Sequence, residues 1–162
     1  MLRLSAIVIT RNEAAKIADC LKSLAFCDER IVVDCGSDDD TARIAREHGA
    51  RVEHHAFEGF GAQKNFALSL ASGEWVLSVD ADERVSPALA AEITAAIGEK
   101  GIDGYEMPRS SSFLGRAMRH SGWYPDYVLR VFRRGRARFS DHVVHERVVC
   151  EGPVRRPAPR PG

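Results

Sequence analysis

Carboxylate side chains gather directly after a strongly apolar stretch of the chain. Residues 75–79 (WVLSV) run straight into Asp80, Asp82 and Glu83. In extended backbone, residues two apart point to the same side, so Asp80 and Asp82 can face one point together. Mg²⁺ and Mn²⁺ are commonly held by one or two carboxylates, water and substrate phosphates. The spacing predicts a metal–diphosphate site at Asp80 and Asp82; the alternative is a solvated strand end whose acidic side chains cap the next helix.

The elements that must position these carboxylates follow from the pattern of apolar residues. The first two-thirds of the chain alternates continuous apolar runs, typical of strands buried on both faces, with segments of helical periodicity. The predicted strands are residues 4–10, 30–34, 50–55 and 75–79, and the predicted helices begin at Asn12 as N-cap, Thr41, about Gln63 and Pro87. This alternation predicts an α/β sandwich with a mainly parallel sheet, which binds ligands at the carboxyl ends of its strands. Asp34 and Asp80 both fall at such ends.

The sequence changes character after Gly101. Residues 102–150 hold most of the aromatic residues, many arginines and alternating segments such as YVLRVF. This pattern predicts an antiparallel extension of the first sheet, so residues 1–150 are expected to form one domain. Residues 151–162 (EGPVRRPAPRPG) are rich in Pro, Arg and Gly and cannot build a core, so we expect this tail to be disordered.

Composition describes a globular protein with two differently charged halves. Of the 162 residues, 44% are hydrophobic and 28% are charged, and the formal net charge is zero. Residues 1–104 carry a net charge of −7 and residues 105–162 one of +7. An acidic half facing a basic half suits a metal and an anionic ligand held between them, although two differently solvated surfaces are the simpler explanation.

No segment predicts secretion or a membrane span. The four cysteines form no C-x-x-C pair, and the N-terminal apolar run is too short for a signal peptide. The run before Asp80 is also short of the about 20 residues that a membrane helix needs. We therefore expect a cytoplasmic protein with reduced thiols and no nucleic-acid partner. Peripheral contact of the Arg-rich half with anionic lipid stays open.

Other phosphate-binding and hydrolytic motifs are missing from the sequence. No G-x-G-x-x-G follows the first strand, no G-x-x-x-x-G-K-[ST] occurs, and the glycines of GFGAQKN (59–65) have neither spacing. No G-x-S-x-G elbow occurs either, which argues against a serine hydrolase. Dinucleotide binding and P-loop chemistry are therefore not predicted.

Five segments of the sequence together match a family pattern. They are AIVITRNEAAKIADCLKSL (6–24), IVVDCGSDDDTARIAREHGA (31–50), GFGAQKNFALSLASGEWVLSVDADERV (59–85), GWYPDYVLRVFRR (122–134) and VHERV (144–148). The first three resemble the nucleotide-sugar-binding domain of glycosyltransferase family 2, which has the GT-A fold. The last two resemble the branch of glucosyl- and heptosyltransferases that assembles the lipopolysaccharide core. The resemblance covers residues 4–150, with the segments in order.

The resemblance implies an inverting transferase that takes a sugar from a nucleotide-diphosphate donor. It also implies that Asp80 and Asp82 hold Mn²⁺ or Mg²⁺ on the diphosphate, where the metal helps the diphosphate to leave. The implied nucleotide-sugar site is Thr10, Arg11, Asn12, Glu13, Asp34 at the base, Gly36, Ser37, Lys64 near the diphosphate, Asp80 and Ala81. Many relatives have an aromatic residue at Arg11 and a second acidic residue at Cys35, so the nucleotide stays open.

An inverting transfer needs a general base for the acceptor hydroxyl, opposite the leaving diphosphate. The candidate residues are Asp126, Asp141, His142, His145 and Glu146. The resemblance favours Glu146 as the base, followed by Asp141, and makes His145 a further metal or diphosphate ligand. The candidate acceptor contacts are Trp123, Asp126 and Arg130. Packing on the sheet is the alternative for Trp123, and a solvated strand face is the alternative for Arg130.

We therefore expect a metal-dependent glycosyltransferase that adds a sugar to a lipopolysaccharide core or related glycan acceptor, at the inner face of the cytoplasmic membrane. One alternative is a sugar-phosphate nucleotidyltransferase, which should carry a glycine-rich basic loop where this chain has TRNEA (10–14). The other is a catalytically incomplete nucleotide-sugar-binding fragment. It is raised by the Pro/Arg-rich end, where members of the resembled branch have further helical residues.

Overall fold

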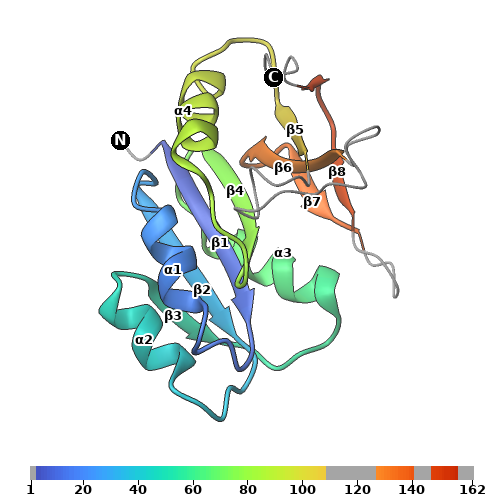
Figure 1. Ribbon diagram of the computed structural model, residues 1–162. Helices are drawn as coiled ribbons and strands as arrows, with labels where there is room; N and C mark the ends of the chain where they lie inside the picture. Colours follow the sequence, from blue (N-terminus) through green and yellow to red (C-terminus); the bar gives the residue numbers. More distant parts are fainter. Residues whose placement is uncertain (1–2, 109–126, 141–146, 157–162) are drawn as a thin grey trace, which may run out of the picture.

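The computed structural model describes residues 3–108, 127–140 and 147–156 (Figure 1). A seven-stranded sheet has the order β3-β2-β1-β4-β6-β5-β9, and a second sheet pairs β7 with β8. The strands are β1 Leu4–Thr10, β2 Glu29–Asp34, β3 Arg51–His54, β4 Trp75–Asp80, β5 Gly104–Pro108, β6 Tyr127–Arg133, β7 Ala137–Phe139, β8 Val148–Cys150 and β9 Val154–Arg155. The helices are α1 Ile17–Ser23, α2 Thr41–Glu47, α3 Phe60–Leu70 and α4 Pro87–Ala96.

The central sheet is parallel where the sequence alternates strands and helices. β1 pairs in parallel with β2 and β4, and β2 pairs in parallel with β3. β6 is antiparallel to both β4 and β5. The predicted α/β sandwich with a mainly parallel sheet and an antiparallel extension is therefore confirmed. The register sets Thr10 beside Asp34 and Ile9 beside Asp80, so the carboxyl ends of β1, β2 and β4 meet at one edge.

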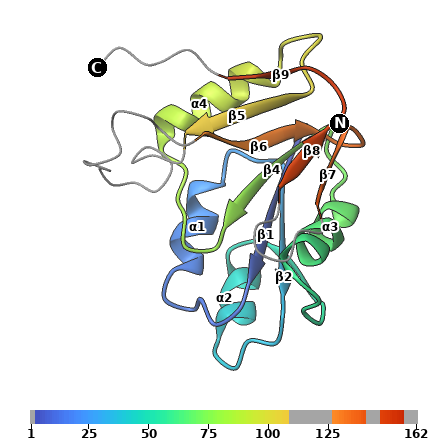
Figure 2. The ribbon, with the colours of Figure 1, turned by 90° about the vertical axis from the view of Figure 1, so that its right-hand side faces the viewer.

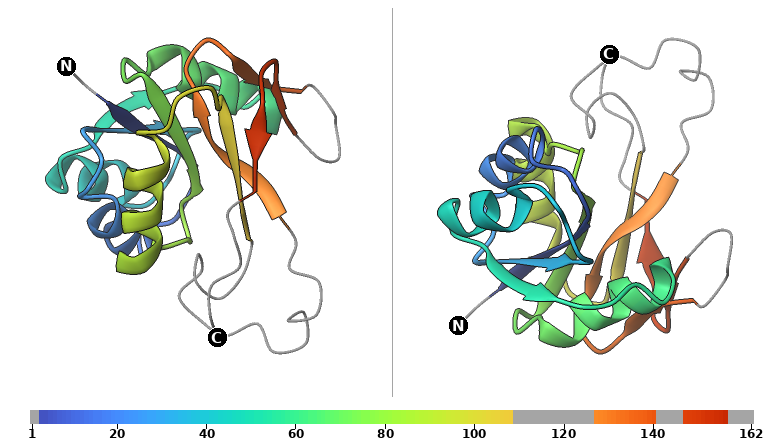
Figure 3. Two further views of the ribbon diagram at one scale, coloured as in Figure 1. Left: turned by 90° about the horizontal axis from the view of Figure 1, so that it is seen from above. Right: turned by 90° about the horizontal axis from the view of Figure 1, so that it is seen from below.

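Helices and a hairpin cover the two faces of the sheet (Figure 3). Successive side chains of a strand point to opposite faces, so Ala6 and Val8 pack in the core under α1, α2 and α4. Ile7 points the other way, into the core under α3 and β7. Trp75 and Phe132 are the largest fully buried side chains among the described residues, one in each core. This double coverage explains the unbroken apolar runs of β1 and β4.

The start of the first helix differs from the prediction. The helix begins at Ile17, and Asn12 is not its N-cap. Asn12 has a φ of 53°, which asparagine tolerates better than most residues, and its Oδ1 accepts a hydrogen bond from the Asp38 amide at 2.8 Å. The side chain therefore fixes a neighbouring loop in place of capping a helix. In α4, by contrast, Ser86 caps the helix by accepting a hydrogen bond from the Leu89 amide.

The end of the chain also differs from the prediction. Val154 and Arg155 form β9, which pairs in parallel with β5 at the outer edge of the sheet (Figure 2). The guanidinium of Arg156 lies over the Tyr127 ring, 4.0 Å from its centroid. Residues 151–156 are thus part of the fold and not of a disordered tail, whereas residues 157–162 lie outside the described residues. In the described part of the chain, no helix has the length and apolar character to span a membrane.

Candidate functional site

A cleft of about 580 Å³ opens at the edge where the parallel strands end. Four segments contribute to it: the end of β1, the loop after β2, the start of α3 with its preceding loop, and the turn after β4. Its lining residues are Ile9, Thr10, Arg11, Glu13, Cys35, Phe57, Phe60, Gln63, Lys64, Asp80, Ala81 and Asp82. The structure therefore brings together seven of the residues predicted from the sequence, namely Thr10, Arg11, Glu13, Lys64, Asp80, Ala81 and Asp82.

Side chains of opposite charge lie together in this cleft. The Lys64 ammonium lies 3.7 Å from Asp80 Oδ1, and the Asp82 side chain is exposed. Lys64 Nζ also lies over the Phe139 ring, 5.6 Å from its centroid. No group of three or more His, Cys, Asp or Glu side chains is arranged to hold a metal in the described residues. Asp80 and Asp82 alone fit a cation whose remaining ligands are water and phosphate oxygens.

A buried ion pair holds the turn that carries the two aspartates. Glu83 is 3% exposed and Arg130 is 6% exposed, and they form two parallel contacts of 2.8 and 2.7 Å. Burial raises the pKa of Glu83, and the Asp80 charge adds to this, while Arg130 opposes both. The solvated strand face that was the alternative for Arg130 is therefore wrong. Its guanidinium lies inside the protein, where it also donates to the Ser78 carbonyl at 3.2 Å.

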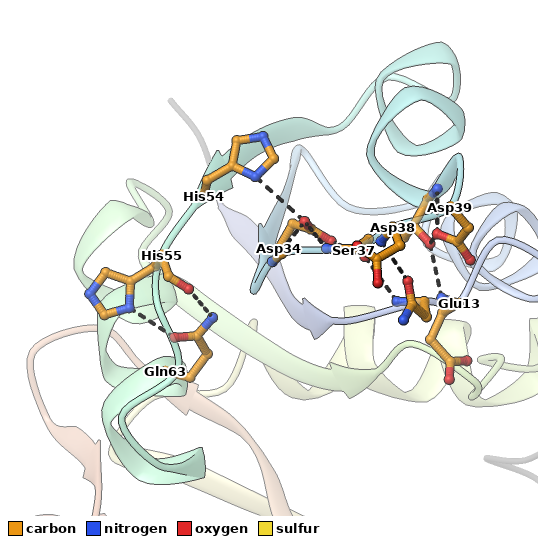
Figure 4. A network of polar contacts seen from close by, with 11 residues as sticks. Glu13, Asp34, Ser37, Asp38, Asp39, His54, His55 and Gln63 are labelled. Atoms are coloured by element: carbon orange, nitrogen blue, oxygen red, sulfur yellow. Dashed lines mark hydrogen bonds and ion pairs between the residues drawn. The ribbon is translucent and has the colours of Figure 1, made fainter.

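Asp34 is hydrogen-bonded to Ser37 in the loop after β2 (Figure 4). It is not among the residues that line the cleft. The side chain is 1% exposed, and Oδ2 accepts hydrogen bonds from the amides of Gly36 at 3.2 Å and Ser37 at 2.9 Å. His54 Nδ1 lies 3.4 Å from the same oxygen. Gly36 adopts a φ of 85°, which a residue with a side chain rarely takes. A contact from Asp34 to the nucleotide base, and from Gly36 and Ser37 to the nucleotide sugar, stays a prediction.

The loops after β1 and β2 are joined by side-chain hydrogen bonds (Figure 4). The Asn12 amide donates to Ser37 Oγ at 2.9 Å, and the Glu13 amide donates to Thr41 Oγ1 at 2.9 Å. The Thr41 hydroxyl donates to Asp39, and this bond is the main reason that the pKa of Asp39 is lowered. The first-strand end is therefore a fixed wall of the cleft. Asn12 supports this wall from behind and is not among the lining residues.

An aromatic pair on the opposite wall was not predicted from the sequence. Phe57 and Phe60 are 49% and 52% exposed, and their rings meet edge to face with centroids 5.0 Å apart. Gln63, one turn further, is buried and its amide is bound to both the ring and the carbonyl of His55. The glycine spacing of GFGAQKN (59–65) predicts no phosphate loop and gives no indication of the two rings. The sequence signal for this pair is Phe60, an aromatic residue at the first position of α3, where polar residues are usual.

The β7–β8 hairpin is fastened to α3 beside the cleft. The Asn65 side-chain amide donates to the Phe139 carbonyl at 2.9 Å, and its Oδ1 accepts from the Phe139 amide at 2.8 Å. Ser140 and Arg147 then close the hairpin through two hydrogen bonds of 2.7 and 3.0 Å. The predicted residues Trp123, Asp126, Asp141, His142, His145 and Glu146 lie outside the described residues.

The end of β1 holds one unsatisfied polar atom. Thr10 Oγ1 is buried and has no hydrogen-bond partner within the described ranges. It is the only buried side-chain oxygen of this kind there, and Thr10 is a lining residue of the cleft. Buried hydroxyl groups are nearly always paired, so a bound molecule or water is expected to supply the hydrogen-bond partner of Thr10 Oγ1.

Comparisons with known proteins agree on one family. The model of glycosyl transferase family 2 matches residues 5–158. The lipopolysaccharide core biosynthesis glycosyltransferase LpsC of Rhizobium meliloti is 36% identical over 94% of this chain, which spans 59% of that relative's length. The predicted resemblance to the lipopolysaccharide core branch is therefore confirmed.

Solved structures show the same fold. Staphylococcus aureus TarS 1–349 in complex with UDP-GlcNAc has a TM-score of 0.55 and 32% identity, covering 64% of this chain and 33% of that one. Glucosyl-3-phosphoglycerate synthase of Mycobacterium tuberculosis, with Mn²⁺, UDP and glucosyl-3-phosphoglycerate, has a TM-score of 0.55 and 28% identity, covering 65% and 43%. These neighbours are GT-A glycosyltransferases, so the predicted GT-A fold is confirmed.

Proposed function

Because this chain belongs to glycosyltransferase family 2, we propose that its cleft binds a nucleotide-diphosphate sugar and that the protein transfers the sugar to an acceptor. One observation carries the proposal: Asp80, Asp82 and Lys64 line one cleft at the carboxyl edge of the parallel sheet, with Lys64 paired to Asp80. Ligands of such sheets bind at this edge. No glycine-rich basic loop follows β1, which argues against a nucleotidyltransferase.

The diphosphate is proposed to bind beside Lys64 and the two aspartates, which all line the cleft. Two carboxylates with water and phosphate oxygens form a suitable Mg²⁺ or Mn²⁺ site, and the related mycobacterial synthase holds Mn²⁺ together with UDP. A bound metal would neutralise the charge that develops on the leaving diphosphate. Lys64 lines the same cleft and contributes a positive charge, with its ammonium 3.7 Å from Asp80 Oδ1.

The nucleoside is proposed to lie along the end of β1. Thr10 and Arg11 line the cleft there, and the Thr10 hydroxyl has no partner in the described part of the chain. The exposed rings of Phe57 and Phe60 offer the flat apolar surface on which a base stacks. Both structural neighbours described above bind uridine nucleotides, so UDP-sugars are the first donors to test.

Glu146 is the proposed general base of an inverting transfer, with Asp141 as the second candidate and His145 as a further ligand. The positions that flank residues 141–146 support this. Ser140 and Arg147 are bonded to each other, and Phe139 packs under Lys64 at the wall of the cleft. Asp141 and Glu146 lie in the sequence between Ser140 and Arg147, and an inverting transfer needs such a carboxylate to take the proton of the acceptor hydroxyl.

The proposed acceptor is a lipopolysaccharide core or a related glycan, which the printed name of the Rhizobium relative supports. A glycolipid acceptor would bring the protein to the inner face of the cytoplasmic membrane. Trp123 and Asp126 stay proposed acceptor contacts. Arg130 is not proposed again, because its guanidinium is engaged with Glu83.

Calorimetric titration with UDP-, ADP- and GDP-sugars in the presence of Mn²⁺ tests the proposal and identifies the donor. We expect one nucleotide to bind clearly, and sugar transfer from it to a lipopolysaccharide core to fall in Glu146→Gln without loss of donor binding. Binding of a donor without any transfer would indicate a nucleotide-sugar-binding protein. Binding of none would refute the proposal.

A further inference from the structure

One residue, Glu83, closes the turn between β4 and α4 through both its backbone and its side chain. The Glu83 amide donates to the Asp80 carbonyl at 2.9 Å, and Glu83 Oε1 accepts from the Asp80 amide at 2.8 Å. The same oxygen accepts from Arg130 Nη1 at 2.8 Å, and Oε2 accepts from Nη2 at 2.7 Å. Glu83 therefore holds the backbone of Asp80, and Arg130 on β6 holds Glu83.

Neither member of this ion pair lines the cleft, although both lie directly behind it. Arg130 Nη1 also donates to the carbonyl of Ser78 at 3.2 Å, two residues before Asp80. The guanidinium thus joins the last residues of β4 to the turn that follows. Burying a charged pair carries a desolvation penalty, and apolar side chains of similar volume often stabilise a fold as well or better. Its geometry here has a specific effect, which is to fix one backbone segment.

We propose that Arg130 and Glu83 are positioning residues that hold the turn of Asp80 and Asp82 in the shape that binds the donor diphosphate. The inference rests on the proposed function of the cleft. It makes β6, which contributes nothing to the cleft lining, a determinant of donor affinity. Groups that orient metal-binding carboxylates from behind usually change affinity by about 10- to 100-fold when they are removed.

A buried thiol reports on the same turn without any ligand. Cys20 Sγ lies 3.6 Å from the Asp80 carbonyl. Burial, followed by the charge of Glu83, raises the pKa of Cys20 to about 12. Burial likewise raises the pKa of Cys27 to about 12, but neither Asp80 nor Glu83 acts on that thiol. Loosening the turn should therefore speed alkylation of Cys20 relative to Cys27, whereas global unfolding speeds both.

The test replaces the pair in two ways and compares them. Glu83→Leu with Arg130→Met removes the charges and the acceptor for the Asp80 amide. Glu83→Gln with Arg130→Met removes the charges but keeps an oxygen for that amide. We expect the first to weaken UDP binding with Mn²⁺ by about 10- to 100-fold and the second to restore most of the affinity. Both variants lack the Glu83 charge that raises the pKa of Cys20, so faster Cys20 alkylation in the first than in the second reports loosening of the turn. Thermal unfolding identifies the folded variants, and Arg130→Lys serves if a double variant does not fold.

Unchanged UDP affinity in a folded Leu/Met variant, with Cys20 alkylated no faster than in the Gln/Met variant, would overturn the inference, because the pair would then only fill space. Equal losses in the Leu/Met and Gln/Met variants would overturn it as well. Asp82→Asn separates this inference from the function it rests on. If Asp82→Asn leaves UDP binding intact, the proposed donor site is wrong, whereas a loss there with no loss in the pair variants refutes the positioning role alone.

Discussion

Removing the side chain of Asn65 should loosen the β7–β8 hairpin from α3. The amide makes two hydrogen bonds to the Phe139 backbone, of 2.9 and 2.8 Å, and spans 74 residues of sequence. Asn65→Ala leaves the backbone N–H and carbonyl of Phe139 without these partners, and Phe139 is only 2% exposed. The hairpin ends at Ser140 and Arg147, next to the segment that contains the proposed base.

The size of the effect follows from these two groups. An unsatisfied buried group costs about 1–3 kcal/mol, and partial access of water favours the lower half of that range. Alanine recovers about 0.5 kcal/mol through its higher helix propensity. We therefore expect Asn65→Ala to lower the free energy of unfolding by about 2–3 kcal/mol.

Urea denaturation followed by circular dichroism measures this difference. Ser69→Ala on the exposed face of α3 is the matched control, because its hydroxyl bonds only to the carbonyl of Phe66 within the same helix. If Glu146 is the base, Asn65→Ala should also slow transfer while UDP binding persists. Equal stability of Asn65→Ala and Ser69→Ala would refute the role of this clamp.

Three further outcomes are expected. Phe60→Ala should weaken UDP binding by about tenfold in calorimetry, since stacking on an aromatic ring is worth about 1–3 kcal/mol per base, and unchanged affinity would remove the ring from the site. Cys35, which lines the cleft, should be alkylated faster than Cys20 and be protected by UDP; equal modification with and without UDP would contradict that. Burial alone would raise the pKa of Glu29, but hydrogen bonds led by that from Ser5 lower it overall. Glu29→Gln should therefore lower the free energy of unfolding near neutral pH. The difference in this free energy between the variant and wild type should shrink as pH falls below the ordinary carboxyl pKa. A difference that persists in acid would refute the stabilising role of the ionised Glu29 carboxylate.

The elements that carry the cleft were predictable because local pattern decides them. β1 and β4 are unbroken apolar runs buried on both faces, and the rule that ligands bind at the carboxyl edge of a parallel sheet places Asp80 near Asp34. Thr41 and Pro87 begin helices as predicted, because each is preceded by a loop and followed by residues that favour helix. Asp80 and Asp82 thus reach the cleft as the sequence indicates.

The remaining features depend on contacts between distant parts of the chain. Glu83 and Arg130 are 47 residues apart, and nothing in either segment shows that the two charges meet inside the protein. The sequence around Asn12 predicts a helix cap, but in the structure its side chain accepts a hydrogen bond from the Asp38 amide in a loop distant in sequence. The strand at Val154 forms only because β5 leaves an edge open, which composition alone cannot indicate.

The central claim is that Asp80 and Asp82 bind the diphosphate of a nucleotide sugar in this cleft. Calorimetric titration of UDP with Mn²⁺ into Asp82→Asn tests it most directly. Glu47→Gln is the matched control, since it removes one negative charge that pairs with Arg43 on α2, outside the cleft. We predict that Asp82→Asn weakens binding by at least about tenfold while Glu47→Gln binds like the wild type. Equal affinity of all three proteins would contradict the account.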